Sequence, residues 1–168
     1  MRLLNRLSNN RDERSLASQL RRRRFRFFRS LFDPLPRPLR LLDVGGTRLF
    51  WQQMGFADEA GVEIVLLNHQ AGELALRERD IGATHFVEHI GDARAMPEFG
   101  DHSFDVVFSN SVLEHVGTFE DQQRMMAEVR RVGKRYFVQT PNYYFPLEPH
   151  FLVPGFQFLP LEAKIWLL

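Results

Sequence analysis

The chain has 168 residues, of which 44% are hydrophobic and 26% charged, a composition that suits one domain with a substantial apolar core. It contains no cysteine, which excludes disulfide bonds and thiolate metal sites and favours a reducing, cytoplasmic setting, and no apolar run approaches the length of a membrane span. The net charge of +1 conceals an asymmetry, because residues 1–40 hold twelve arginines and three acidic residues whereas the remainder is acidic.

The arginine-rich segment is predicted to form a helix. Between Asp12 and Phe32, apolar residues recur at spacings of four and seven, as they do on the packed side of an amphipathic helix. The residues expected on that side are Leu16, Leu20, Phe27, Phe28, Leu31 and Phe32. The prolines of residues 34–38 then end the helix and form a stiff linker.

Residues 21–29 are the centre of the positive charge. The solvated face of a helix that packs on the body of the protein explains most runs of this kind. An anionic membrane surface and a phosphate-bearing substrate are the alternative contacts. Nucleic acid is disfavoured as a partner, because no DNA- or RNA-reading module is recognisable in the chain.

Five short apolar runs alternate with helical patterns in the rest of the chain. The expected strands are Leu39–Val44, Val62–Asn68, Thr84–Asp92, Phe104–Asn110 and Lys134–Thr140. Helices are expected from Arg48 onward, at Gly72–Asp80 and at Phe119–Val132, with a turn or short helix at Ser111–Val116. This alternation predicts an α/β, Rossmann-like, doubly wound and mainly parallel sheet.

The first strand ends in Asp43 and Val44 and is followed by two glycines, Gly45 and Gly46. Glycines after a strand allow a tight turn and let a ligand approach bare backbone, while the next helix points its free N–H groups back at the turn. An ordinary turn is the alternative interpretation. Polar residues also follow the other strands, and the carboxyl ends of parallel strands meet at one edge, where ligands of such sheets bind.

Four stretches then point to a family. They are 41–47 (Leu-Leu-Asp-Val-Gly-Gly-Thr), 91–97 (Gly-Asp-Ala-Arg-Ala-Met-Pro), 103–116 and 128–132. In their order and spacing the chain resembles the class I S-adenosylmethionine-dependent methyltransferases, of the small-molecule type related to the ubiquinone and menaquinone biosynthesis enzymes. The resemblance covers about residues 38–142. It implies an enzyme that transfers a methyl group from S-adenosylmethionine to a small-molecule acceptor, lipid-like or quinone-like among others, and releases S-adenosylhomocysteine.

The resemblance also assigns residues to the cofactor. These residues are Asp43, Gly45, Gly46, Thr47, Asn68, Asp92, Ala93 and Asn110. The glycine motif would approach the methionine part of the cofactor, Asp92 would lie beside the adenine amino group, and Asn110 would lie beside the sulfonium. Asn68 stands where the family usually has an acidic residue for the ribose hydroxyls, although an amide can also accept and donate hydrogen bonds. Capping of local turns is the alternative role for Asp92 and Asn110.

The acceptor side is expected to involve His115 and the aromatic segment after the fifth strand. His115 follows the fourth strand and is the candidate general base, with an ordinary surface or core histidine as the alternative. Tyr143, Tyr144 and His150 are the candidates for shaping the acceptor pocket. Residues 143–168 would form the floor of an apolar pocket, lie on a membrane or pack over the sheet.

Three segments are therefore expected: the basic helix and linker (1–37), the cofactor-binding core (38–142) and the aromatic acceptor-side segment, which ends inside a helix (143–168). By the resemblance, the sheet has about five strands in the order 3-2-1-4-5 and lacks the closing hairpin that the family ordinarily adds. A homo-oligomer or another partner would cover the open edge. No metal site is expected, because His85 and His89 lack an evident third ligand.

Two rival functions stay open. A nicotinamide dehydrogenase would carry G-x-G-x-x-G after the first strand, a spacing that is absent here. A non-catalytic, truncated methyltransferase-like module that binds a membrane or a partner protein is favoured by the short glycine motif, by Asn68 and by the missing hairpin. The chain is expected to be cytoplasmic, with peripheral membrane contact through 21–29 or 143–168 as the alternative.

Overall fold

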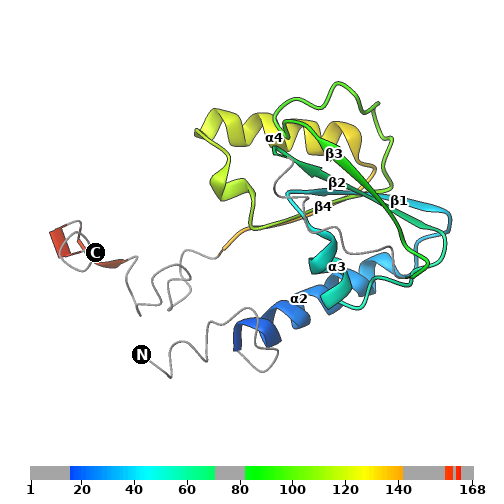
Figure 1. Cartoon of the computed structure of the whole chain (residues 1–168). Coiled ribbons are helices and arrows are strands. Elements are labelled where there is room, and N and C mark those ends of the chain that lie inside the picture. Colours follow the sequence, from blue (N-terminus) through cyan, green and yellow to red (C-terminus); the bar gives the residue numbers. More distant parts are fainter. Residues whose placement is uncertain (1–15, 71–81, 142–157, 161, 164–168) are drawn as a thin grey trace. The chain divides into compact units, whose positions relative to one another are not determined.

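The structure, a computed structural model, describes residues 16–70, 82–141, 158–160, 162 and 163 (Figure 1). The chain divides into two compact units, which are described separately. One unit comprises residues 31–140 and contains the sheet. The other comprises residues 1–30 and 141–168 and includes most of helix α2.

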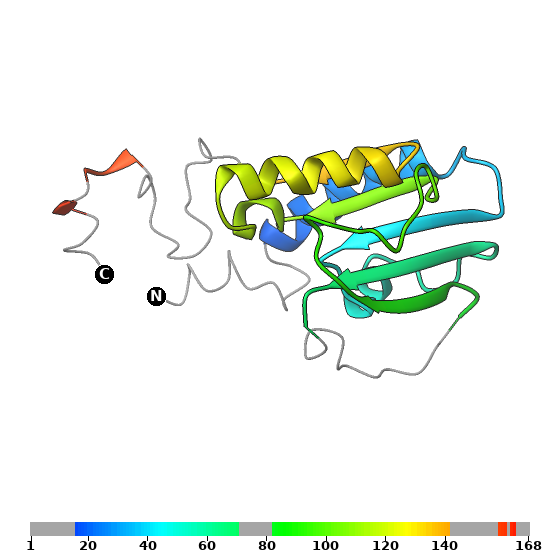
Figure 2. The same cartoon turned by 90° about the horizontal axis from the view of Figure 1, so that it is seen from above.

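Five parallel strands lie side by side in the sheet (Figure 2). In chain order they are β1 (Leu39–Val44), β2 (Val62–Asn68), β3 (His85–Ile90), β4 (Val106–Asn110) and β5 (Tyr136–Gln139). Their order in space is β3-β2-β1-β4-β5, and every neighbouring pair is parallel. In the central strand, Asp43 pairs with Leu66 on one side and Phe108 on the other. The predicted α/β class and strand order are confirmed.

Three strands are shorter than the apolar runs suggest, and side chains accept backbone hydrogen bonds at the start of two of them. The fourth strand begins at Val106 rather than Phe104, since the side chain of Asp105 accepts a hydrogen bond from the backbone N–H of Arg40 at 2.9 Å. The third begins after Thr84, whose hydroxyl accepts from the N–H of Glu59 at 2.8 Å. The fifth covers only Tyr136–Gln139. The expected helix at residues 72–80 lies outside the described residues.

Helix α4 (Phe119–Val132) covers one face of the sheet (Figure 1). Strand side chains alternate between faces, so Leu42 and Val44 of β1 point toward this helix. The buried residues that pack together here include Leu42, Val44, Val65, Leu67, Val107, Met125, Val129 and Val132. A capping box starts the helix, in which Thr118 and Asp121 each accept a hydrogen bond from the other's backbone N–H. The helix matches the predicted range residue for residue.

Helix α3 (Arg48–Gln53) lies on the opposite face (Figure 1). Its Trp51 is fully buried and contacts the rings of Phe56 and Phe108, with centroids 5.1 Å apart in each case. The ring of Phe32 packs edge-on against Phe56, also at 5.1 Å. Aromatic rings therefore cluster on this side of the sheet, whereas the α4 side is mainly aliphatic, with Phe99 and Phe104 among its buried residues.

Helix α2 (Leu16–Phe32) forms as predicted and stops before the proline-rich linker. The expected packed side was wrong in part, because Phe27 is 59% exposed and Leu31 is 53% exposed. Phe28 and Phe32 are buried as expected, and Phe25 is buried with them in place of Phe27 and Leu31. The side chains of Leu16 and Leu20 lie outside the part that the structure describes. The spacing of the three buried phenylalanines, three and four residues, fits a helix face as well as the spacing that we used, so periodicity alone could not choose between the two. No helix in the described part of the chain is both long and apolar enough to cross a bilayer.

Candidate active site

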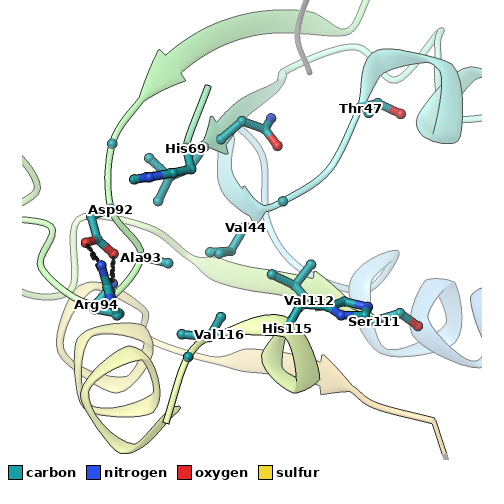
Figure 3. A pocket seen from close by; sticks show the side chains of 15 residues that line it. Val44, Thr47, His69, Asp92, Ala93, Arg94, Ser111, Val112, His115 and Val116 are labelled. Atoms are coloured by element: carbon teal, nitrogen blue, oxygen red, sulfur yellow. Dashed lines mark hydrogen bonds and ion pairs between the residues drawn. The ribbon is translucent and has the colours of Figure 1, made fainter. Parts of the chain in front are cut away.

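A cavity of about 710 Å³ opens where the central strands end (Figure 3). Its walls come from the ends of β1 and β2 and from the segments that follow β1, β2, β3 and β4, so residues far apart in sequence meet there. The polar or ionisable lining residues are Thr47, Asn68, His69, Asp92, Arg94, Ser111 and His115. Ligands of open parallel sheets bind at this carboxyl edge, where the strand order reverses beside β1.

The glycine turn after β1 gives the cavity a wall of bare backbone. Gly45 has a φ of +77°, and its N–H donates to the carbonyl of Leu67 at 2.8 Å. A Cβ atom at Gly45 would lie 2.5 Å from Cγ2 of Val112, across the cavity wall. Thr47 then caps α3, because its hydroxyl accepts a hydrogen bond from the N–H of Phe50 at 3.3 Å. Both the conformation and the lack of room therefore require glycine at position 45.

Asp43 lies beneath this turn rather than in the cavity wall. Its side chain is 1% exposed, and its Oδ2 accepts a hydrogen bond from Nε1 of Trp51 at 2.6 Å. A Cβ atom at Gly46 would overlap the same carboxyl group, only 1.5 Å from Oδ2. Burial raises the pKa of Asp43 to about 7, although the hydrogen bond from Trp51 opposes that shift. Asp43 thus supports the glycine turn from below.

Asn68 ties the end of β2 to the glycine turn. Its side chain is 4% exposed, and Nδ2 donates a hydrogen bond to the carbonyl of Gly46 at 2.9 Å. A carboxylate at this position could only accept hydrogen bonds and would face that carbonyl without a donor. The amide at position 68 therefore stabilises the turn in a way that an acidic side chain could not.

Asp92 stands on another wall, where Arg94 already binds it. Arg94 donates to Oδ1 from its backbone N–H at 2.9 Å, to both oxygens from Nε at 3.0 Å, and to Oδ2 from Nη2 at 2.8 Å (Figure 3). These hydrogen bonds lower the pKa of Asp92 to about 2. The same guanidinium reaches Oδ1 of Asp121 with Nη1 at 3.3 Å. His69 lies on this side of the cavity and further favours the ionised form of Asp92.

The segment after β4 forms the remaining wall. Ser111 follows the strand with a φ of +58°, a conformation that is rare for residues other than glycine. Val112 and His115 come next, and His115 closes the short helix η2 (Leu113–His115). His115 is exposed and lines the cavity.

Two residues of α4 hold the segment that follows Asp92. Glu128 accepts a hydrogen bond from the backbone N–H of Met96 at 2.6 Å, and Arg131 donates to the carbonyls of Met96 and Phe99, each at 2.8 Å. Glu128 and Arg131 also bind each other at 2.7 Å, which lowers the pKa of Glu128. Residues 96–99 are thereby fixed to the helix mainly through their main chain.

The structure brings most of the predicted site residues together. The predicted cofactor residues that line the cavity are Gly45, Thr47, Asn68, Asp92 and Ala93, and the candidate base His115 lines it as well. Those that do not line it are Asp43, Gly46 and Asn110. The acceptor-side candidates Tyr143, Tyr144 and His150 lie outside the described residues.

Sequence reasoning missed His69, Arg94 and Ser111 as lining residues. His69 directly follows Asn68, and Arg94 stands inside the 91–97 stretch, so both could have been included from their position alone. The left-handed conformation of Ser111 has no counterpart in the sequence, because serine is not a residue that favours positive φ.

The histidines of β3 lie beside carboxylates. Nε2 of His89 lies 2.9 Å from Oε1 of Glu98, and Nδ1 of His85 lies 3.6 Å from Oε2 of Glu63. Among the residues described, no group of three histidine, cysteine or acidic side chains could hold a metal ion.

Comparison with known proteins identifies the family. A family model described as a methyltransferase domain matches residues 42–136, which is more than half of the chain. The chain belongs to this methyltransferase domain family. The resemblance to class I S-adenosylmethionine-dependent methyltransferases, which rested on the same stretches, is thereby confirmed.

Two curated relatives match part of this methyltransferase domain. They are the uncharacterized proteins MT1557 and Rv1509 of two Mycobacterium tuberculosis strains, each 37% identical over 76 residues. That match covers 45% of this chain and 26% of each relative, so the chain spans only about a quarter of their length.

Solved structures share the fold of the methyltransferase domain at low sequence identity. The PH0226 protein of Pyrococcus horikoshii superposes with a TM-score of 0.57 at 19% identity, covering 84% of this chain and 61% of that one. The [4+2]-cyclase SpnF also gives 0.57, at 20% identity, covering 94% and 59%. A SAM-dependent methyltransferase of Methanosarcina mazei gives 0.52 at 18% identity, covering 65% and 55%. At such identities these matches establish the fold alone.

Proposed function

We propose that this methyltransferase domain binds S-adenosylmethionine in the cavity at the carboxyl edge and transfers its methyl group to a small-molecule acceptor. The observation that supports the proposal most is the meeting of the Gly45 turn and the Asp92 carboxylate in one cavity. The backbone at Gly45 lets a ligand approach closely, and the carboxylate of Asp92 can accept a hydrogen bond from an amino group. Both features suit a nucleoside that carries a polar chain.

The residues present fit such a ligand in shape and chemistry. The cavity volume of about 710 Å³ lies within the range of pockets that take cofactor-sized molecules. Gly45 itself brings no side chain into the cavity wall, although the methyl groups of Val112 lie against it. Asp92, with its pKa of about 2, is ionised at any physiological pH and can accept from an amino group.

The protein's own contribution would be positioning more than covalent chemistry. S-adenosylmethionine, when bound, supplies a methyl group already activated by its sulfonium. The walls after β1 and β3 would hold the nucleoside, and the wall after β4 would orient the acceptor and exclude water. The imidazole of His115 would accept the proton that an O–H or C–H acceptor loses when its new bond to the methyl carbon forms.

Calorimetry with S-adenosylhomocysteine tests this proposal. We expect measurable binding to the folded protein and at least about tenfold weaker binding to Asp92→Ala, because an amino group of the ligand would lose its charged acceptor. Asp101→Ala is the matched control, since this carboxylate is exposed and lies outside the cavity. Folded protein that shows no heat of binding and no ligand-induced spectral change would contradict the proposal.

A non-catalytic binding module is the second candidate. The fold also occurs in the cyclase SpnF, so it does not by itself determine a methyl-transfer reaction. The amide of Asn68 is engaged with Gly46, and Asp92 is engaged with Arg94, which leaves fewer polar groups for a ligand. Binding of S-adenosylhomocysteine that is equal in the wild type and Asp92→Ala, without methyl transfer to any acceptor tested, would favour this second function.

A further inference from the structure

Helix α2 carries a concentration of charge that methyl transfer does not explain. Over Leu16–Phe32 it contains six arginines and no acidic residue. Arg22, Arg23, Arg24 and Arg26 are all exposed. Because like charges on one helix repel one another, an anionic surface that neutralises them would stabilise the bound helix.

Two apolar side chains stand among these arginines. Phe27 is 59% exposed, and Leu31, one turn later, is 53% exposed. Arg23 and Arg24 precede Phe27 by four and three residues, so they lie on the same side of the helix and flank it. The exposed side therefore combines a short apolar ridge with guanidinium groups on its borders.

The buried side of the helix is distinct from this one. Phe25, Phe28 and Phe32 are buried, and the rings of Phe25 and Phe28 lie 5.5 Å apart. Phe27 and Leu31 are not among these buried residues. Large apolar side chains on a helix are ordinarily buried, so two that are more than half exposed make this side of α2 unusual.

We propose that the exposed side of α2 docks on an anionic phospholipid bilayer. Arginines would bind the phosphate groups of the lipids, and Phe27 and Leu31 would insert at the boundary between headgroups and acyl chains. A nucleic acid would use the arginines but would offer a protruding Phe27 and Leu31 no apolar layer to enter. The combination of charge with an apolar ridge therefore selects a lipid surface.

Co-sedimentation of the full chain with lipid vesicles tests whether the arginines of α2 contribute to membrane binding. We expect binding to vesicles of phosphatidylcholine mixed with phosphatidylglycerol, little binding to phosphatidylcholine alone, and a steep loss with added salt. The triple variant Arg23→Gln, Arg24→Gln and Arg26→Gln should bind at least about tenfold more weakly. The charge-matched control carries Arg124→Gln, Arg130→Gln and Arg135→Gln, which are exposed arginines of the sheet unit, and should bind nearly as the wild type does.

A second pair of variants tests the apolar ridge. Phe27→Ser should weaken binding several-fold, whereas Phe119→Ser, which replaces a 69% exposed phenylalanine of α4, should not.

Equal loss of vesicle binding in the two arginine triple variants, or equal binding of Phe27→Ser and wild type, would overturn the proposal. Binding to RNA that is unaffected by Phe27→Ser, without binding to anionic vesicles, would overturn it in favour of nucleic acid. Circular dichroism establishes that each variant is folded.

Discussion

Arg94 lies between the carboxylates of Asp92 and Asp121, so replacing it tests whether Asp92 is available to a ligand. Its guanidinium and backbone N–H occupy most of the acceptor positions of Asp92, while Nη1 reaches Asp121. An amino group of a ligand that is to bind Asp92 must therefore displace a contact of Arg94. We expect Arg94→Met to tighten binding of S-adenosylhomocysteine by about five- to tenfold, as measured by calorimetry.

Two controls make this test specific. Arg124→Met removes a second arginine near Asp121, at 3.8 Å, without touching Asp92, and should leave the affinity unchanged. S-inosylhomocysteine has an oxygen in place of the adenine amino group, so its affinity should not rise in Arg94→Met. Weaker binding of S-adenosylhomocysteine to Arg94→Met would show instead that Arg94 orients Asp92 for the ligand.

Asp43 should make stability depend on pH in the opposite direction to most carboxylates. Its pKa is raised from 3.8 to about 7 by burial, so between those values the folded state holds a proton that the unfolded state has lost. Stability should therefore fall as the pH rises from about 4 to about 7, by at most about 1.4 kcal/mol per pH unit, and level off above. The Asp43→Asn variant, whose side-chain oxygen can still accept from Trp51, should lack this contribution.

Urea denaturation of wild type and Asp43→Asn at pH 5 and pH 8 measures the effect. We expect the difference in unfolding free energy between the two proteins to shift in favour of the Asp43→Asn variant at the higher pH. A difference that is the same at both values would mean that Asp43 is ionised throughout, and would contradict the raised pKa. Other carboxylates cancel in this comparison because both proteins contain them.

At the scale of elements, replacing the threonine N-caps of two helices should distinguish an effect on folding stability from an effect on ligand affinity. Thr118 caps α4 and Thr47 caps α3, but only Thr47 lines the cavity. Thr118→Ala should lower the unfolding free energy by about 1 kcal/mol and leave the affinity for S-adenosylhomocysteine unchanged. Thr47→Ala should lower both, as chemical denaturation and calorimetry would reveal. Equal effects of the two variants on affinity would contradict a role for the start of α3 in the site.

The elements themselves were largely predictable. Val62–Asn68 and Phe119–Val132 have the predicted bounds because each combines a clear apolar pattern with a strong end, such as the Thr118 cap. Ends set by tertiary contacts were not predictable: the hydrogen bond from Arg40 to the side chain of Asp105 joins residues 65 positions apart. The same holds for α2, where the packed side depends on partners outside the helix.

The position of the cavity was predictable from the sequence, whereas the hydrogen bonds of its side chains were not. Strand ends and the parallel order placed Gly45, Asn68 and Asp92 at one edge, as expected. What each side chain does there depends on neighbours that no local pattern specifies. Trp51 donates a hydrogen bond to Asp43 and keeps it below the turn. Arg94 binds the carboxylate of Asp92, which was expected to bind the ligand.

For the whole molecule, a ligand that binds only the folded state should stabilise it through mass action. At a hundred times its dissociation constant, S-adenosylhomocysteine should add about 2.7 kcal/mol to the unfolding free energy and raise the melting temperature by several degrees. Scanning calorimetry with and without the ligand measures the shift. Asp92→Ala, titrated at the same ligand concentration, should show a smaller one, and an equal shift in both would place the ligand elsewhere.

The hydrogen bonds of Glu128 and Arg131 with residues 96–99 determine which side chains near the cavity can be substituted without moving the backbone. They hold the N–H of Met96 and the carbonyls of Met96 and Phe99, atoms that every substitution other than proline retains. Ala93 lines the cavity and takes no part in these hydrogen bonds, so its side chain can change while Met96 and Phe99 stay anchored to α4. Such an arrangement lets evolution, or an engineer, revise ligand preference along this wall while its course in space is preserved.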